Sequence, residues 1–173
     1  MKKASEARQK VVEQQIKDYA DELEEIYETV KDKDEIFNKI IQRLYDVFSK
    51  ACDFEEQNDD IQAVEQYFLC LGLIKEVMDS GIYHPRKDRE YLREILTTFD
   101  LPCSIKMARI MFSTGNYDEV YVLSERVLAI DFYNEEARGY LAYIKKAEKN
   151  PEWRRVKDAK DIHAYIREYY AIQ

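Results

Sequence analysis

Apolar side chains recur every three or four residues along almost the whole chain, which is the spacing of one buried face of an α-helix. No stretch of strand length alternates apolar and polar residues. Polar or proline-containing breaks fall near residues 32–34, 57–59, 81–85, 100–101, 115–116, 131–134 and 150–151. The pattern predicts an all-α fold of about eight helices, near residues 4–31, 35–56, 60–79, 86–99, 102–113, 117–130, 135–149 and 158–172.

Several breaks hold residues that end or begin helices. Gly115 can adopt the left-handed conformation that ends a helix. Side chains placed to cap the following helices are those of Asp59 or Asp60, Asn116 and Asn134. Pro102 is acceptable in a first turn, so we expect a new helix to begin there.

The first predicted helix carries a narrow apolar seam at spacings of four and three, as in a coiled coil. The seam consists of Val12, Ile16, Tyr19, Leu23, Ile26 and Val30. A stripe this narrow packs against one neighbour, either the next helix of the same chain or a second copy in a homodimer. We therefore divide the chain into an N-terminal amphipathic helix, residues 1–33, and a helical domain, residues 34–173.

Composition agrees with a helical, globular chain. The 173 residues are 46% hydrophobic and include only 4 Gly and 3 Pro, which leaves few residues for the turns of an all-β fold. The net charge is −8, and residues 1–80 hold 11 basic and 20 acidic side chains. An acidic half of this size argues against direct binding to nucleic acid, which needs a surface that neutralises phosphates.

No segment has the roughly 20 consecutive apolar residues that cross a bilayer, and no signal peptide follows the first lysines. The three cysteines are widely spaced without a CxxC pair, and each lies in an apolar helical stretch. We interpret them as small buried hydrophobes in a reducing compartment. The expected location is the cytoplasm, without membrane attachment.

Sequence motifs for chemistry are missing. His84 and His163 are the only histidines, and neither belongs to an HExxH or Glu-x-x-His motif. There is no glycine-rich phosphate loop and no nucleophile elbow. The acidic stretch 53–60 lacks the glycine and the alternating ligands of a calcium loop, so we interpret it as a solvated helix junction. We expect a non-enzyme with no cofactor and no metal site.

The helix pair around Gly115 resembles a tetratricopeptide repeat, a helical hairpin of about 34 residues. Gly115-Asn116-Tyr117-Asp118-Glu119 is similar to the family's link between its two helices, and Val127–Asp131 to the end of the second helix. Ala108 falls where the family places a small residue, and Ala142 takes the equivalent place in the next repeat. The best match covers about 101–149.

The resemblance is incomplete. Ser104 replaces the usual large aromatic residue, Val120 the usual alanine and Phe132 the usual proline. A fainter copy covers about 44–77, and the breaks at Asn58 and Gly115 are 57 residues apart. We therefore expect an irregular array that contains an extra helix.

In this family the first helix of each pair lines the concave side, so the resemblance implies a groove for a partner helix or peptide. The groove residues it implies are Tyr45, Phe48, Cys52, Ile105, Arg109, Phe112, Tyr143 and Lys146. Only Arg109 and Lys146 are basic and no asparagine is present, which argues against a clamp for a peptide's terminal carboxylate. An apolar groove suits an amphipathic helix, and the chain's own terminal helix is the alternative occupant.

A second candidate surface is basic. It consists of Lys149, Trp153, Arg154, Arg155 and Lys157. This segment is either a solvated face or a docking site for an acidic partner, including the acidic half of a second copy.

The function that the resemblance implies is non-catalytic binding of another protein, as an adaptor or scaffold in assembly or regulation. One alternative is the helical effector domain of a bacterial transcription activator, although the chain has no DNA-reading segment. The other is an α-helical enzyme whose site is assembled from scattered residues. Polar side chains converging in one buried pocket would favour the enzyme, and an open apolar groove would favour the adaptor.

Overall fold

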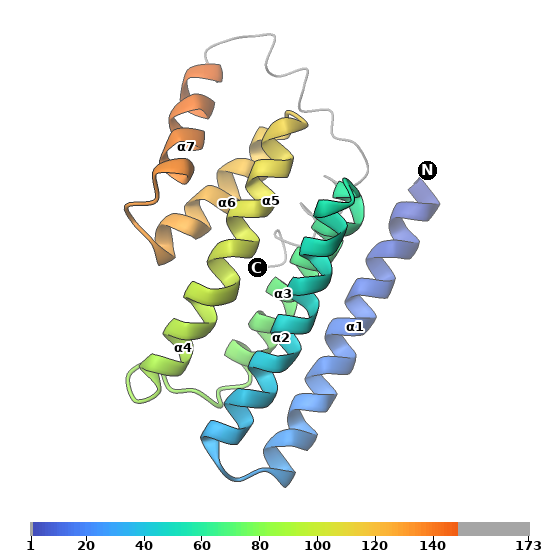
Figure 1. Ribbon diagram of the computed structural model, residues 1–173, viewed down its shortest axis with the longest axis vertical. Helices are drawn as coiled ribbons and strands as arrows, with labels where there is room; N and C mark the ends of the chain where they lie inside the picture. Colours follow the sequence, from blue (N-terminus) through green and yellow to red (C-terminus); the bar gives the residue numbers. More distant parts are fainter. Residues whose placement is uncertain (1, 149–173) are drawn as a thin grey trace. The chain divides into compact units, whose positions relative to one another are not determined.

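The structure, a computed structural model, describes residues 2–148 (Figure 1). Its elements in chain order are α1 (Lys2–Thr29), α2 (Lys33–Glu56), α3 (Asp60–Asp79), α4 (Arg89–Ile95), the π-helical segment η1 (Leu96–Asp100), α5 (Leu101–Ser113), α6 (Tyr117–Ile130) and α7 (Glu135–Ala147). No β-strand occurs in this range, so the predicted all-α class is confirmed. The predicted helix near 158–172 and the break at 150–151 lie outside the described residues, and the number of eight helices stays a prediction.

The chain leaves α5 through the left-handed glycine that the sequence predicts. Gly115 has φ +79°, its N–H donates to the Phe112 carbonyl at 3.1 Å, and the Asn116 N–H donates to the Met111 carbonyl at 3.0 Å. These two bonds form a Schellman motif, which satisfies carbonyls that have no partner within the helix. Asn58, with φ 59°, occupies the same position after α2.

Two of the predicted N-caps form. The Asp59 carboxylate accepts a hydrogen bond from the Gln62 N–H at 3.2 Å, and the Asn134 side chain accepts one from the Ala137 N–H at 2.9 Å. Asn116 occupies the N-cap position of α6, but its side chain makes no capping hydrogen bond. The predicted capping role of the Asn116 side chain is therefore wrong.

The predicted break at residues 100–101 is also wrong, because the helix continues from α4 through η1 into α5. Pro102 has no N–H, and its ring would clash with the carbonyl of Thr98 in a regular α-helix. The widened turn of η1 ends two residues before the proline, and the Leu101 N–H donates to the Leu96 carbonyl five residues earlier. A π-helical turn thus lets the helix pass a proline that would otherwise end it.

The chain divides into two compact units. We call Lys10–Cys103 the N-terminal unit, and the described residues 2–9 and 104–148 the C-terminal unit. Most of the helix that the sequence analysis separated as residues 1–33 belongs to the N-terminal unit, together with α2, α3, α4 and η1.

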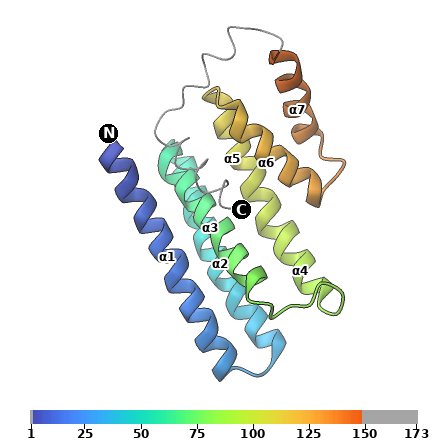
Figure 2. The same cartoon turned by 180° about the vertical axis from the view of Figure 1, so that it is seen from behind.

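The seam of α1 is covered within the N-terminal unit. Its buried members are Val12, Ile16, Tyr19 and Leu23. Figures 1 and 2 show α1 beside α2 and α3. A Cβ atom on Gly72 of α3 would lie only 2.4 Å from the Ile16 Cδ1, so the glycine permits the close approach of the two helices. The guanidinium of Arg43 lies 5.9 Å from the centre of the Tyr19 ring.

The centre of the N-terminal unit is α3, which is buried around most of its circumference. Eleven of its twenty residues are buried, including every residue from Tyr67 to Ile74. Cys70 and Cys103 are fully buried, and burial raises the pKa of the Cys103 thiol well above its usual value. Both therefore behave as core residues. Cys52 is partly exposed, and its Sγ accepts a long hydrogen bond, 3.6 Å, from the Tyr67 hydroxyl.

None of the helices between residues 2 and 148 combines the length and the hydropathy that a membrane-crossing segment requires.

Candidate protein-binding face

Four aromatic rings of the C-terminal unit meet where α5, the start of α6 and α7 come together. The Phe112 ring centre lies 5.5 Å from that of Tyr117, 4.8 Å from that of Tyr140 and 5.0 Å from that of Tyr143. The rings of Tyr117 and Tyr143 are 5.5 Å apart. These four residues, which we call the aromatic cluster, are at distances typical of favourable ring pairs.

Local structure places each ring. The Schellman motif after α5 turns the chain sharply, which brings Tyr117 back over Phe112. Tyr140 and Tyr143 are three residues apart on α7 and therefore lie on the same helical face. The Asn134 cap sets where α7 begins, so it also sets the direction of these two side chains.

An ion pair fastens α7 to α5 beside the aromatic cluster. The guanidinium of Arg109 donates to both carboxylate oxygens of Glu136, at 2.9 Å each. The Tyr140 hydroxyl donates to the same carboxylate at 2.7 Å. These donors lower the pKa of Glu136, the Arg109 hydrogen bond having the larger effect. Burial and the bond to Glu136 raise the pKa of Tyr140 to about 12.

The aromatic cluster is partly open to solvent. Tyr143 is 47% exposed, and Phe112, Tyr117 and Tyr140 are half-buried. The hydroxyls of Tyr117 and Tyr143 are 3.5 Å apart, and this contact raises the pKa of Tyr117 to about 12. Every ring is thus held by neighbours while part of its apolar surface remains accessible.

The structure brings together three of the predicted groove residues, Arg109, Phe112 and Tyr143. Ile105 is buried and offers little surface to a partner. Lys146 is exposed on the last turn of α7. The residues of the second candidate surface, Lys149, Trp153, Arg154, Arg155 and Lys157, lie outside the described residues.

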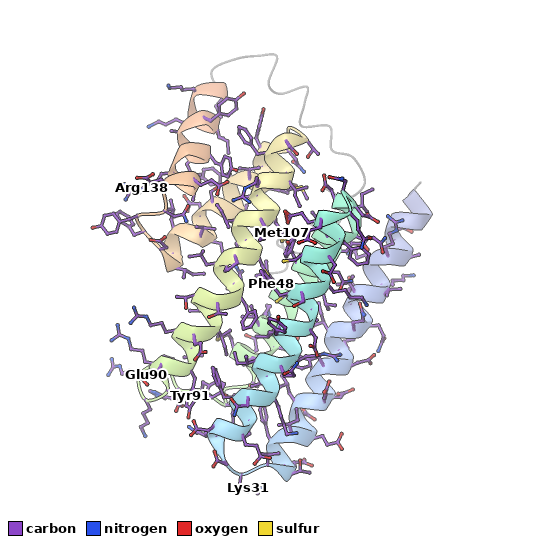
Figure 3. All side chains as sticks on the ribbon, in the orientation of Figure 1. Lys31, Phe48, Glu90, Tyr91, Met107 and Arg138 are labelled. Carbon is purple, nitrogen blue, oxygen red and sulfur yellow. The ribbon has the colours of Figure 1, made fainter. Side chains whose placement is uncertain are left out.

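The remaining predicted groove residues belong to the N-terminal unit. Tyr45 is 58% exposed on α2. Phe48, labelled in Figure 3, is half-buried, with its ring centre 5.9 Å from that of Tyr67 and 6.2 Å from that of Phe99. Phe48 is therefore mainly an internal packing residue of that unit.

Three residues of the candidate site were not predicted from the sequence, namely Tyr117 and Tyr140 of the aromatic cluster and Glu136, which pairs with Arg109 beside it. Glu136 and Tyr140 are four residues apart and Tyr143 follows three later, which marks one face of α7. This spacing alone predicts that Glu136, Tyr140 and Tyr143 lie on the same side of the helix. Their pairing with Arg109 and Phe112 depends on contacts between helices and has no signal in the sequence.

A cleft lies between α6 and α7, with a volume of about 280 Å³. Its lining residues are Tyr117, Asp118, Tyr121, Val122, Ile144 and Glu148. Tyr117 belongs both to this cleft and to the aromatic cluster.

The turn between α6 and α7 carries two further exposed aromatic residues, Phe132 and Tyr133. Arg138, labelled in Figure 3, places its guanidinium 4.5 Å from the centre of the Phe132 ring and donates to the Phe132 carbonyl at 2.8 Å. The cation–π contact and the hydrogen bond stabilise the turn.

No group of three or more His, Cys, Asp or Glu side chains with metal-binding geometry occurs among the described residues. The His84 Nδ1 accepts hydrogen bonds from the N–H groups of Arg86 and Lys87, at 3.2 and 3.3 Å. The Asp88 carboxylate accepts hydrogen bonds from the backbone N–H of His84 at 2.7 Å and from the Lys33 ammonium group at 3.0 Å. Within the described chain, His84 therefore supports the loop between α3 and α4.

Comparisons with protein-family models, with curated protein sequences and with solved structures find no match to this chain.

Proposed function

We propose that the chain is a non-catalytic protein-binding module, similar to a tetratricopeptide array, which binds a helix or peptide of another protein through the aromatic cluster. The observation that carries this proposal is the position of the cluster. It joins α5 to α7, the two helices that the resemblance assigns as first helices of successive repeats, and its rings remain partly exposed.

The chemistry of the cluster suits a binding site. Aromatic side chains offer a large contact area at a low cost in conformational entropy, and they dominate the binding energy of many interfaces. The Arg109–Glu136 ion pair and the Tyr117–Tyr143 contact already hold the rings in the free protein. A partner would therefore lose little free energy to ordering this face.

The same contacts favour one kind of partner. Arg109 directs its guanidinium at Glu136, so this basic group beside the cluster already has a carboxylate partner. A partner held by a terminal carboxylate would have to displace Glu136 from a bidentate ion pair. An apolar or aromatic side chain on an amphipathic helix meets no such competition and matches the half-exposed rings.

The test is a pull-down from native cell extract with the full chain and with Tyr143→Ala. Removing a central aromatic anchor typically costs about 2 kcal/mol of binding free energy, roughly a thirtyfold loss of affinity. We expect the wild type to retain a protein that Tyr143→Ala loses, and the complex to persist with the purified components.

The matched control is Tyr133→Ala, which removes an exposed tyrosine from the α6–α7 turn. It should retain the partner. If wild type, Tyr143→Ala and Tyr133→Ala recover identical proteins while all remain folded, the aromatic cluster is not the binding surface.

A further inference from the structure

The α6–α7 cleft lies at the point where the described chain ends. Glu148, the last described residue, is one of the residues that line it. Twenty-five residues, 149–173, follow directly from this edge of the cleft. This terminal segment therefore begins beside a cleft whose lining includes the exposed apolar side chains of Tyr121 and Val122.

The cleft has the form of a groove between helical ridges. Tyr117 and Tyr121 are four residues apart on α6, and Ile144 of α7 lies four residues before Glu148, the C-cap residue of that helix. Two ridges of this kind can accept the side chains of a third helix between them. Tyr121 and Val122 line this groove and are 47% and 43% exposed, so both leave apolar area uncovered.

The sequence after Glu148 contains a matching ridge. Its apolar residues Ile162, Tyr165, Ile166 and Tyr169 have the i, i+3, i+4, i+7 spacing of one helical face. A helix over the fifteen residues 158–172 would be about 22 Å long. That length suits the neighbouring helices α6 and α7, which have 14 and 13 residues.

The connecting residues allow the chain to turn back. Residues 149–157 span at most about 30 Å when extended, which is enough to reverse direction at the end of α7. They carry four basic side chains and one acidic side chain. The cleft lining contributes the acids Asp118 and Glu148, so the charges of the connection and of the cleft edge are complementary.

We propose that residues 158–172 form a helix that docks in the α6–α7 cleft of the same molecule, with its Ile162–Tyr169 face against Tyr121 and Val122. The docked helix extends α6 and α7 into a three-helix layer. Because Tyr117 lies in both the cleft and the aromatic cluster, the terminal segment also supports one edge of the proposed binding face.

Hydrogen–deuterium exchange of the full-length chain tests this docking without any partner, so its outcome is independent of the proposed function. In the wild type, amides in 158–172 should exchange at least about tenfold more slowly than in an unstructured peptide. Val122→Glu places a charge in the cleft and should remove most of that protection. Ile61→Glu, at a similarly exposed apolar residue of α3, is the control and should leave the protection unchanged.

Three results would overturn the proposal. They are a terminal segment without protection in the wild type, protection that survives Val122→Glu, and protection that increases with protein concentration because a second copy fills the cleft. The unfolding midpoint of each variant shows whether it is folded.

A photo-crosslinker in place of Tyr121 provides an assay that does not rely on Val122→Glu folding. It should form an intramolecular crosslink to a peptide within 158–172. Crosslinks only to another molecule, or none at all, would contradict the docking.

Discussion

The rings around Phe48 in the N-terminal unit and around Phe112 in the C-terminal unit have opposite surroundings. In the N-terminal unit the Phe48 ring packs against Tyr67 and Phe99, both of which are buried. In the C-terminal unit the Phe112 ring packs against tyrosines that all keep part of their surface exposed. The first arrangement stabilises a core, whereas the second leaves apolar area available for binding.

The helices behind these rings differ in the same way. Eleven of the twenty residues of α3 are buried. On α7, only Ala137 and Ile144 are buried among the side chains that the structure describes. A helix buried on most sides contributes mainly to stability, whereas one buried along a narrow stripe can present its other faces to a partner.

The largest expected effect comes from the core of the N-terminal unit. Leu44→Ala removes a fully buried side chain of α2 and should lower the free energy of unfolding by about 3 kcal/mol, because it leaves a cavity. Tyr143→Ala in the C-terminal unit should cost about 1 kcal/mol or less, because the ring is half-exposed. Urea denaturation measures the free energy of unfolding of both variants. Equal losses of stability would contradict the expected difference between the two sites.

The seam of α1 provides the next prediction. Leu23→Ala should lower the free energy of unfolding by about 2 to 3 kcal/mol, because Leu23 is buried within the N-terminal unit. Sedimentation should give the same mass for the variant and the wild type, since α2 and α3 cover the seam in the same chain. A shift of mass toward the monomer would show instead that the seam pairs two copies.

Two asparagines in the C-terminal unit differ in their expected contribution. Asn134→Ala removes a capping hydrogen bond of α7 and should cost about 1 kcal/mol. Asn116→Ala should cost less, because its buried amide atoms have no hydrogen-bond partner among the described residues. Thermal unfolding of both variants shows which one loses more stability. A larger loss of stability for Asn116→Ala would show that the Asn116 side chain contributes more than the Asn134 cap.

The smallest expected effect is on the dependence of stability on pH. Hydrogen bonds from the backbone N–H of His84 and from the Lys33 side chain lower the pKa of Asp88 in the N-terminal unit. The hydrogen bonds from Arg109 lower the pKa of Glu136 in the C-terminal unit. A carboxyl with a depressed folded-state pKa stabilises the fold above its unfolded pKa, and this contribution is lost as the pH falls through the folded-state value.

The change that tests this linkage is Glu136→Gln. Stability should decrease less on acidification below pH 4.5, the ordinary pKa of the Glu136 carboxyl, in this variant than in the wild type. Because Arg109 is more than half exposed, the difference should be small. Urea midpoints across the acidic range measure it. An unchanged pH slope would show that solvent screens this ion pair.

Features with local causes were predictable from the sequence. Gly115 ends α5 and Asn134 begins α7 through hydrogen bonds to residues within a few positions, so a short stretch of sequence contains all the participants. The continuous apolar character of α3 also identified it as central, because no other arrangement buries a helix that is apolar around most of its circumference.

Features that join distant segments required the tertiary structure. Pro102 alone predicts a break, and only the π-helical turn before it shows how the helix continues. Apolar spacing placed Phe48 and Phe112 in the same class, because spacing specifies which face of a helix is apolar. The neighbours that cover each ring come from other helices, and their packing alone made one aromatic residue part of a core and the other part of a surface.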